Sequence, residues 1–306
     1  MRDRLARHHT DLILFYLLGL FWGSSFVGIH ILVNQIPPFF TAAVRMGIAL
    51  LALLVIFKLQ GKAIHLPRKE RWGVWTAGLI TLGIPFSLLF WAEQRISAGL
   101  GGIMNGTTPL FTVLFLIIGG MQARRPSWKV FVGLAVGFIG ILVIFAPRFQ
   151  LQEKSEDLTG AAAALLMAIC YALSNVLNVR LMGEGKKLDL RTVVFHQHAS
   201  SWVYLIVISL LFEPFPSVHA LAKIEVVSAF LYLGVISSAF AMLIHFHLIR
   251  SMGAIKTSAV AYVVPVSALL LDYWVIGHQP SWFSIVGIAL IFTGLFLLRS
   301  GGEHTG

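Results

Sequence analysis

The chain alternates between long apolar stretches and short polar gaps. A bilayer core about 30 Å thick is crossed by a helix of roughly 20 predominantly apolar residues. Stretches of that length occur ten times in the 306 residues, which leaves no room for a soluble domain. The pattern predicts ten membrane-spanning helices at 12–33, 38–57, 72–92, 98–120, 127–146, 158–181, 192–212, 226–249, 254–277 and 282–299.

The first stretch has a second interpretation, because basic residues precede it as they do in a signal peptide. The apolar region of such a peptide is about 7–15 residues long. The stretch 12–33 is longer, and nine similar stretches follow it. We therefore expect it to remain in the protein as a membrane helix.

Composition agrees with a membrane protein. Hydrophobic residues make up 58% of the chain and charged residues 12%, whereas soluble domains carry about 25% charged residues. The net charge of +10 would by itself suggest nucleic acid as a partner. The single cysteine, Cys170, lies within the sixth helix, so no disulfide can form within the chain.

The basic residues gather on one side of the predicted membrane, which argues against nucleic acid. Of the 23 Lys and Arg residues, 18 lie in the N-terminal tail, in alternate gaps or at the end of the last helix. The other side holds four, and Arg45 lies within the second helix. Because cytoplasmic loops retain Lys and Arg, we expect both termini in the cytoplasm, as tails 1–11 and 300–306.

The two halves of the chain share short sequence matches. Chance is the alternative explanation, because Gly and Pro are common in membrane helices. The matched segments are Pro126-Ser127-Trp128 with Pro280-Ser281-Trp282, Gly133 and Gly140 with Gly287 and Gly294, and Ala98–Pro109 with Ala254–Pro265.

These matches predict an internal repeat of five helices, at 12–147 and 158–299, joined by an extracytoplasmic linker at 148–157. Five is odd, so the second repeat enters the membrane from the opposite side. Inverted repeats are typical of secondary transporters, in which the substrate site lies near the midplane where the repeats meet. The predicted fold is therefore an all-α polytopic membrane protein with two inverted five-helix repeats.

Further motifs stand in a fixed order along the chain. They are Trp22-Gly23-Ser24-Ser25-Phe26, Arg45, Ser97-Ala98 through Thr108-Pro109-Leu110-Phe111, Gly253-Ala254 through Val264-Pro265-Val266, and the two glycine pairs in helices 5 and 10. Together they resemble the motifs of the drug/metabolite transporter superfamily, in its ten-helix group with two EamA domains. The resemblance covers about residues 12–299. Two places depart from the Gly-Glu that usually follows helices 4 and 9: Gly120-Met121-Gln122 and Gly277-His278.

The resemblance implies a central cavity lined mainly by helices 1, 3, 4, 6, 8 and 9, with helices 5 and 10 at the periphery. It also implies export of small metabolites, often amino acids. Substrates vary greatly among members of the group. The implied location is a bacterial inner membrane, with a monomer as one option for an oligomeric state that stays open.

Polar and aromatic residues within the helices are the candidates for a substrate site, because such residues usually face the bundle or a water-filled path. The alternatives are packing, hydrogen bonds between helices and, for Trp91, a place in the aromatic belt at the outer face. The candidates for substrate binding are Trp22, Ser25, Trp91, Asn105, Thr108, Tyr171, Asn175, Met242, His245 and Tyr262.

Pro109, Pro265 and Arg45 are candidates for a gating or structural role. Each proline leaves a helix carbonyl without its usual partner, which could bend a gate or simply kink the helix. The resemblance implies that Arg45 holds the bundle together. His196 and His198 could couple transport to protons, and Asp272 is the best acidic candidate for that role.

Aromatic rings with neutral hydrogen-bonding groups suit a neutral or zwitterionic solute with apolar surface, and an amino acid fits this description. No phosphate-binding loop or helix-borne zinc motif is present. We expect no catalytic residues, cofactor or metal, and hence a non-ATP secondary transporter. The alternatives are a facilitative or proton-coupled transporter of other metabolites or drugs, an intramembrane enzyme, and a scaffold or receptor.

Overall fold

The computed structural model describes residues 2–61, 64–121, 126–150, 157–182, 188–271, 273–274 and 279–300. Within these residues the chain is helical and has no strand. Ten helical segments are long and apolar enough to cross a membrane, which confirms the predicted all-α fold with ten spans. Asp272 and the family departures at Gln122, Gly277 and His278 lie outside the described residues.

The first five spans contain both straight and interrupted helices. The first two are α1 (Arg2–Val33) and α2 (Pro38–Leu59). The third joins η1 (Arg68–Glu70), α3 (Arg71–Gly78), the π-helical η2 (Leu79–Gly83) and α4 (Ile84–Glu93). The fourth is α5 (Ala98–Gly106) with α6 (Thr108–Ile118), and the fifth is α7 (Trp128–Gln150).

The second five spans repeat this sequence of elements. They begin with α8 (Leu158–Met182) and α9 (Leu190–Phe212), followed by the short α10 (Val218–Leu221) outside the spans. The eighth span joins α11 (Ile224–Leu231), the π-helical η3 (Tyr232–Phe240) and α12 (Ala241–Met252). The ninth is α13 (Ala254–Ser258) with α14 (Val260–Leu271), and the tenth is α15 (Trp282–Ser300).

Polar side chains mark where several of these helices begin. Ser97 accepts a hydrogen bond from the backbone N–H of Leu100 at 3.2 Å, ahead of α5. Asp157 accepts bonds from the backbone N–H and the hydroxyl of Thr159, at 2.8 and 2.7 Å, ahead of α8. The bonds from the backbone N–H groups of Leu100 and Thr159 satisfy first-turn donors that have no partner within the helix. The two bonds from Thr159 also hold the pKa of the Asp157 carboxyl below its usual value.

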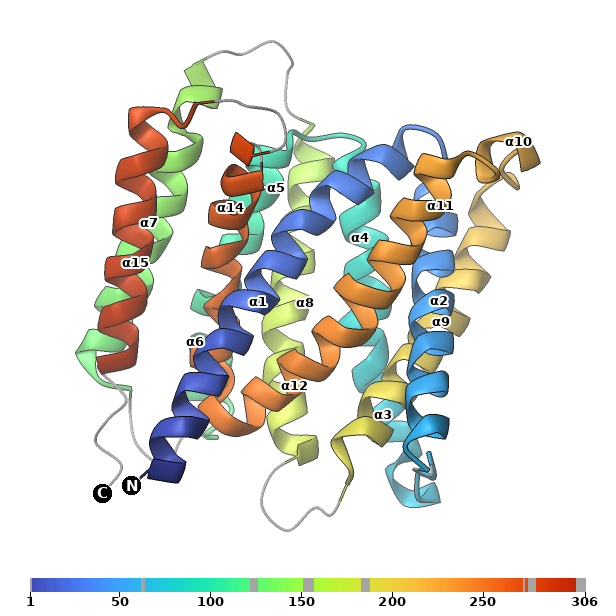
Figure 1. Cartoon of the computed structure of the whole chain (residues 1–306), viewed down its shortest axis with the longest axis horizontal. Coiled ribbons are helices and arrows are strands. Elements are labelled where there is room, and N and C mark those ends of the chain that lie inside the picture. The colour runs from blue at the N-terminus through green and yellow to red at the C-terminus, as the bar shows by residue number, and fades with distance from the viewer. Residues whose placement is uncertain are drawn as a thin grey trace.

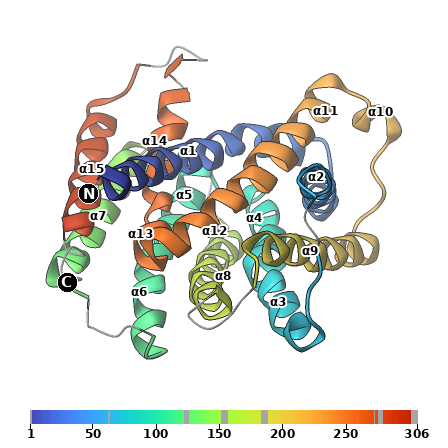
Figure 2. The ribbon, with the colours of Figure 1, turned by 60° about the horizontal axis from the view of Figure 1, so that its bottom comes forward.

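The spans run side by side, and the start of α1 and the end of α15 lie at the same face of the bundle (Figure 1). Helices α7 and α15 lie together at one edge in both views (Figure 1 and Figure 2) and share the most extensive contact between any two elements. The fifth and tenth spans are therefore peripheral, as the family resemblance implies.

Reciprocal glycine contacts relate the two halves. Gly133 of α7 lies against the backbone of Gly294 in α15, and Gly140 lies against Gly287. Gly133 and Gly287 are repeat equivalents, as are Gly140 and Gly294, each pair 154 residues apart, so the repeat maps one glycine contact onto the other. This arrangement is that of two inverted repeats related by an approximate two-fold axis.

A second pair of glycines follows the same relationship. Gly78 packs against the backbone of Gln197 in α9, and Gly234, which is 156 residues later, packs against Ile48 and the backbone of Arg45 in α2. The third span of each half thus contacts the second span of the other half. Segments η2 and η3 also occupy corresponding positions, immediately after Gly78 and around Gly234.

Large apolar side chains cover the outside of the bundle. Leu51, Ile118, Val207 and Phe296 are among many that remain exposed on the outer helix faces. Soluble monomers seldom expose contiguous apolar surface on this scale. The outer surface is therefore suited to lipid, and the buried polar residues are left for the interior.

Candidate functional site

A cavity lies between the spans in the interior of the bundle. About 850 Å³ around its lining residues is free of atoms, a figure that includes open solvent at the mouth of the cavity. Its wall is mainly apolar, with polar groups at separated positions. Both repeats contribute residues to it, through spans 1 to 4 and spans 6, 8 and 9.

Eight of the ten predicted substrate-binding residues line this cavity. They come from α1, α5, α6, α8 and α12, which are far apart in the sequence. The eight are Trp22, Ser25, Asn105, Thr108, Tyr171, Asn175, Met242 and His245.

Trp91 and Tyr262 lie elsewhere. Trp91 is near the end of α4, where the guanidinium carbon of Arg95 is 3.7 Å from the centre of its ring, a position that suits an aromatic belt. Tyr262 is fully buried in α14 and donates a hydrogen bond to the backbone carbonyl of Leu134 in α7 at 3.0 Å. Its ring also packs on Gly137, so Tyr262 holds the ninth span against the fifth.

Trp22 and His245 form one side of the cavity. Their ring centroids are 5.2 Å apart with an interplanar angle of 51°, which joins α1 to α12. The hydroxyl of Ser25 donates to the carbonyl of Trp22 at 2.6 Å, so it bonds within its own helix. Beside this wall, the hydroxyl groups of Ser24 and Tyr232 are hydrogen-bonded to each other.

Three polar atoms of the cavity residues have unused hydrogen-bonding capacity. They are Asn175 Oδ1, Thr108 Oγ1 and His245 Nδ1, which are buried and have no partner among the described residues. The amide nitrogen of Asn175 does have one, because it donates to Thr112 Oγ1 at 3.3 Å. Buried polar atoms without partners are costly, and a polar solute in the cavity could satisfy these three.

The two prolines act on residues of the cavity wall. Pro109 is near the start of α6 and Pro265 is within α14. A proline withholds the N–H that would bond the carbonyl four residues earlier, which is that of Asn105 or Ala261. Both Asn105 and Ala261 line the cavity, and they are repeat equivalents at a separation of 156 residues.

Arg45 also reaches the cavity from α2 and is 2% exposed. Its Nε donates to Ser238 Oγ at 2.7 Å, and its Nη2 donates to the carbonyl of Ser237 at 3.2 Å. Its guanidinium carbon is 4.5 Å from the centre of the Phe86 ring. These contacts join the second, third and eighth spans.

Apolar clusters lie along α8 on either side of the cavity residues. Along α8, Ala163 and Ala164 pack in a cluster with Ala92 and Ile96 beyond one end of the cavity. Tyr171 and Asn175 follow in the cavity wall. Val176 then packs with Leu116 and Ala254 beyond the other end. The wall of the cavity therefore occupies the middle part of α8.

Sequence reasoning missed the contribution of the π-helical segments. Thr81 and Leu82 of η2 and Ser237 of η3 line the cavity. Thr81 and Ser237 are repeat equivalents, again separated by 156 residues. A π-helical turn changes which side chains face inward, so regular helical spacing could not find them, although the repeat alignment could have.

A polar network beside the cavity ties three spans together. Gln197 Nε2 donates to Asn178 Oδ1 at 2.8 Å, and Asn178 Nδ2 donates to Thr81 Oγ1 at 3.4 Å. Asn178 and Gln197 are fully buried. Asn178 therefore makes hydrogen bonds between helices.

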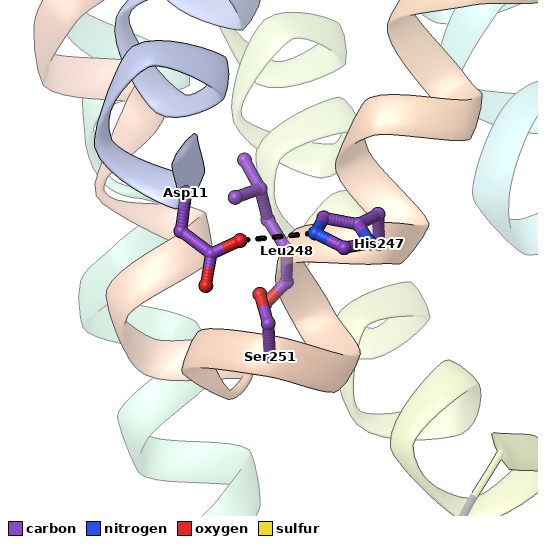
Figure 3. A network of polar contacts seen from close by, with 4 residues as sticks. All are labelled: Asp11, His247, Leu248 and Ser251. Carbon is purple, nitrogen blue, oxygen red and sulfur yellow. Dashed lines mark hydrogen bonds and ion pairs between the residues drawn. The ribbon is translucent and has the colours of Figure 1, made fainter. Parts of the chain in front are cut away.

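His196, His198 and His247 are not among the residues that line the cavity. His196 Nε2 is 3.0 Å from the carbonyl of Ile64, and His198 Nδ1 is 2.8 Å from that of Val194. Figure 3 shows His247 of α12 facing Asp11 of α1, with Nε2 and Oδ1 2.9 Å apart. Among the described residues, no group of three or more His, Cys, Asp and Glu is placed to hold a metal ion.

Comparison with protein families gives two matches along the chain. The model of the EamA-like transporter family matches residues 10–146 and again residues 158–300. A protein of known crystal structure shares the fold, with a TM-score of 0.77 at 18% sequence identity. The alignment covers 95% of this chain and 98% of that one.

Several curated relatives of similar length are named as transporters. The uncharacterized inner membrane transporter YedA of Escherichia coli (strain K12) is 26% identical, over 94% of this chain and 89% of the relative. The uncharacterized transporter YoaV of Bacillus subtilis (strain 168) is 25% identical, over 91% of this chain and 92% of the relative. These matches and the ten apolar helices confirm a multi-pass protein of the bacterial inner membrane type.

Proposed function

The chain belongs to the EamA-like transporter family and is a membrane transporter, and we propose that it exports small metabolites such as amino acids. The proposed mechanism is alternating access of one central cavity without ATP. The family and the relatives' names describe transporters rather than enzymes. In this proposal both chain ends lie in the cytoplasm.

The observation that carries the proposal is the cavity shared by the two repeats. Asn175 Oδ1, Thr108 Oγ1 and His245 Nδ1 give it polar atoms without protein partners. Phe26, Phe86 and other apolar residues make up most of the wall. A solute that has both hydrogen-bonding groups and an apolar part matches these surfaces, and an amino acid with a hydrophobic or aromatic side chain is such a solute.

Alternating access is supported by the inverted repeat and by the apolar clusters at the two ends of the cavity. Leu116 and Val176 belong to the cluster at one end, and Ala92 and Ile96 belong to that at the other. Inverted repeats allow one conformation to convert into its mirror arrangement across the membrane. In our proposal the two clusters open in turn while the cavity residues keep the solute between them.

The test is an efflux and sensitivity screen in a bacterial host that lacks its own amino-acid exporters. The protein is overexpressed, and the cells are challenged with amino acids, toxic analogues and dipeptides. Selective resistance with faster loss of the preloaded solute supports export and names the substrate class. Sensitivity that does not change, although the protein is in the membrane, counts against amino-acid export and favours other metabolites or drugs.

Variants connect the screen to the cavity. N105A and N175A remove groups from its wall, whereas T293A removes an exposed hydroxyl that bonds the carbonyl of Ala289 in its own helix. We expect the first two to reduce export and T293A to leave it unchanged. Full export by W22A, N105A and N175A alike would exclude this cavity as the substrate site.

Transport could be coupled to protons or proceed by facilitated diffusion, and coupling is considered because His245 lies in the cavity wall. Transport in proteoliposomes with an imposed pH gradient, at a fixed membrane potential, separates proton coupling from facilitated diffusion. Transport that responds to the gradient supports coupling. Transport that ignores it supports facilitated diffusion.

A further inference from the structure

The charge of Arg45 has no acidic partner in the cavity. No ion pair of the described residues involves this arginine, and the cavity lining contains no Asp or Glu. Two acidic side chains elsewhere have other partners: Asp11 pairs with His247, and Glu213 accepts bonds from the backbone N–H groups of Phe39 and Phe40 at 2.7 Å. A buried charge without a counter-ion is unfavourable.

The protein contacts of Arg45 leave part of the guanidinium free. Its two recorded hydrogen bonds use Nε and Nη2, toward Ser238 and the carbonyl of Ser237. Neither bond uses Nη1, and the guanidinium carries five N–H donors in all. The Phe86 ring, 4.5 Å from the guanidinium carbon, stabilises the charge but accepts no conventional hydrogen bond. Donors of Arg45 are thus available on a residue that lines the cavity.

The position of Arg45 is held by contacts from several sides. The backbone of Arg45 packs against Gly234 of η3, and its side chain reaches Ser238 in the same π-helical segment. Phe86 of α4 lies on another side of the guanidinium. An arginine fixed in this way loses little conformational freedom when it binds a planar anion such as a carboxylate, which it can bond through two parallel N–H groups.

We propose that Arg45 binds the carboxylate of the transported solute and supplies its counter-ion in the cavity. This rests on the proposed function, and it narrows the substrate class to solutes with one carboxylate and an apolar part. Arg45 is the only Lys or Arg among the lining residues, so the site compensates one negative charge. It does not suit a phosphate ester or a polyanion.

The same geometry gives the neighbouring polar atoms a role. Asn175 is one helical turn from Tyr171 on α8, and both residues line the same cavity as Arg45. Asn175 Oδ1, which has no protein partner, is an acceptor suited to an ammonium group. A zwitterion would therefore use both residues, and a simple carboxylic acid would use Arg45 alone.

The experiment measures binding to the purified full-length protein in detergent, by thermal stabilisation and by calorimetry. The probes are L-phenylalanine, 3-phenylpropionate, L-phenylalaninamide and phenethylamine, with the corresponding leucine series. We expect the two acids to bind and the amide and amine to bind at least about tenfold more weakly. Folded wild-type protein that does not prefer the acids in either series would overturn the proposal.

Variants test the arginine itself. We expect R45Q to lose the preference for acids and R45K to keep part of it, because lysine retains the charge without the planar fork. R299Q is the control, since Arg299 also lies over aromatic rings, at 5.4 Å from the centre of Phe15, but is outside the cavity lining. An unchanged acid preference in R45Q would refute the role of Arg45.

A positioning variant covers the case in which R45Q does not fold. S238A removes the acceptor of Arg45 Nε and keeps the charge, so we expect acids to bind more weakly while the amides are unaffected. Equal changes for acids and amides would contradict the proposal.

Export measured in cells is a separate result. Selective acid binding without export refutes the exporter function alone, and export of amides and amines by wild type and R45Q alike refutes the carboxylate site alone.

Discussion

The rings of Trp22 and His245 meet in the cavity wall, with centroids 5.2 Å apart. This contact joins the first span to the eighth, and both residues belong to the cavity lining. A solute that enters the cavity therefore meets an aromatic surface made by both repeats. Aromatic contacts of this kind are worth about 0.5–1.5 kcal/mol beyond the area that they bury.

Truncating this aromatic surface should weaken transport. We expect W22A to lower the apparent affinity for the solute by up to about tenfold, and W22F to retain most of it because a ring remains. Concentration-dependent uptake into proteoliposomes gives the apparent affinities of W22A and W22F. Equal affinities of W22A and wild type would mean that the solute does not touch this ring.

Asn175 and Asn178 should respond differently to the same substitution. Asn175 lines the cavity and has a free Oδ1, whereas Asn178 is hydrogen-bonded to Gln197 and Thr81. We expect N178A to lower thermal stability, by about 1–3 kcal/mol, and N175A to reduce substrate affinity with a smaller loss of stability. Thermal unfolding and transport are measured on both variants. A larger stability loss in N175A together with a larger affinity loss in N178A would contradict the prediction.

A side chain at Gly133 should disrupt the contact between the fifth and tenth spans and lower the stability of the protein. A Cβ at this position would lie 2.6 Å from the carbonyl oxygen of Gly294, so G133A forces two backbones apart at a cost of about 1–3 kcal/mol. G73A is the control, because its Cβ would meet only Leu181 Cδ2 at 3.7 Å. We expect G73A to match or exceed wild type in thermal stability, since alanine favours the helix. Unchanged stability of G133A would show that this contact is loose.

Membrane orientation follows from the basic residues, 18 of which lie on the side of both termini. Cytoplasmic loops retain such residues. We expect a fluorescent protein that folds only in the cytoplasm to be active when fused after the last residue, and a periplasmic phosphatase to be inactive there. An active phosphatase fusion on the intact chain would reverse the orientation.

The pair formed by Asp11 and His247 should contribute little to stability. The side chain of His247 is 50% exposed, although its Nε2 is 2.9 Å from Asp11 Oδ1. Exposed ion pairs are worth about 0–1 kcal/mol. We expect a double-mutant cycle with D11N and H247A to give a coupling energy within this range by thermal or denaturant unfolding. A much larger coupling would indicate that the contact holds α1 to α12 cooperatively.

Much of the fold could be predicted from the sequence, because lipid imposes a simple rule on each span. Ten apolar stretches predicted ten helices, and the glycine pairs predicted the repeat. Helical spacing also placed eight of the ten predicted substrate-binding residues in the cavity wall, since polar groups such as Asn105 and Asn175 avoid lipid. The same rule does not decide whether an interior side chain faces the cavity or a neighbouring helix. Tyr262 was therefore predicted for the cavity, whereas its hydroxyl donates to the carbonyl of Leu134.

The π-helical segments η2 and η3 could not be derived in the same way. Their sequences, which include Thr81 and Ser237, are as apolar overall as regular helix. What distinguishes them is packing, because Gly78 and Gly234 allow close approach of α9 and α2. The environment of Arg45 depends on this packing, since both of its hydrogen bonds reach η3.

The glycine contact between α7 and α15 has a consequence for how such a chain could arise. Gly133 meets Gly294 and Gly140 meets Gly287, and the repeat maps one of these contacts onto the other. The surface is therefore self-complementary, like that of a two-fold symmetric dimer. One five-helix half already presents the edge that a second copy, inserted upside down, would need. An ancestral homodimer of oppositely inserted copies would make the same pair of glycine contacts as the present fused chain.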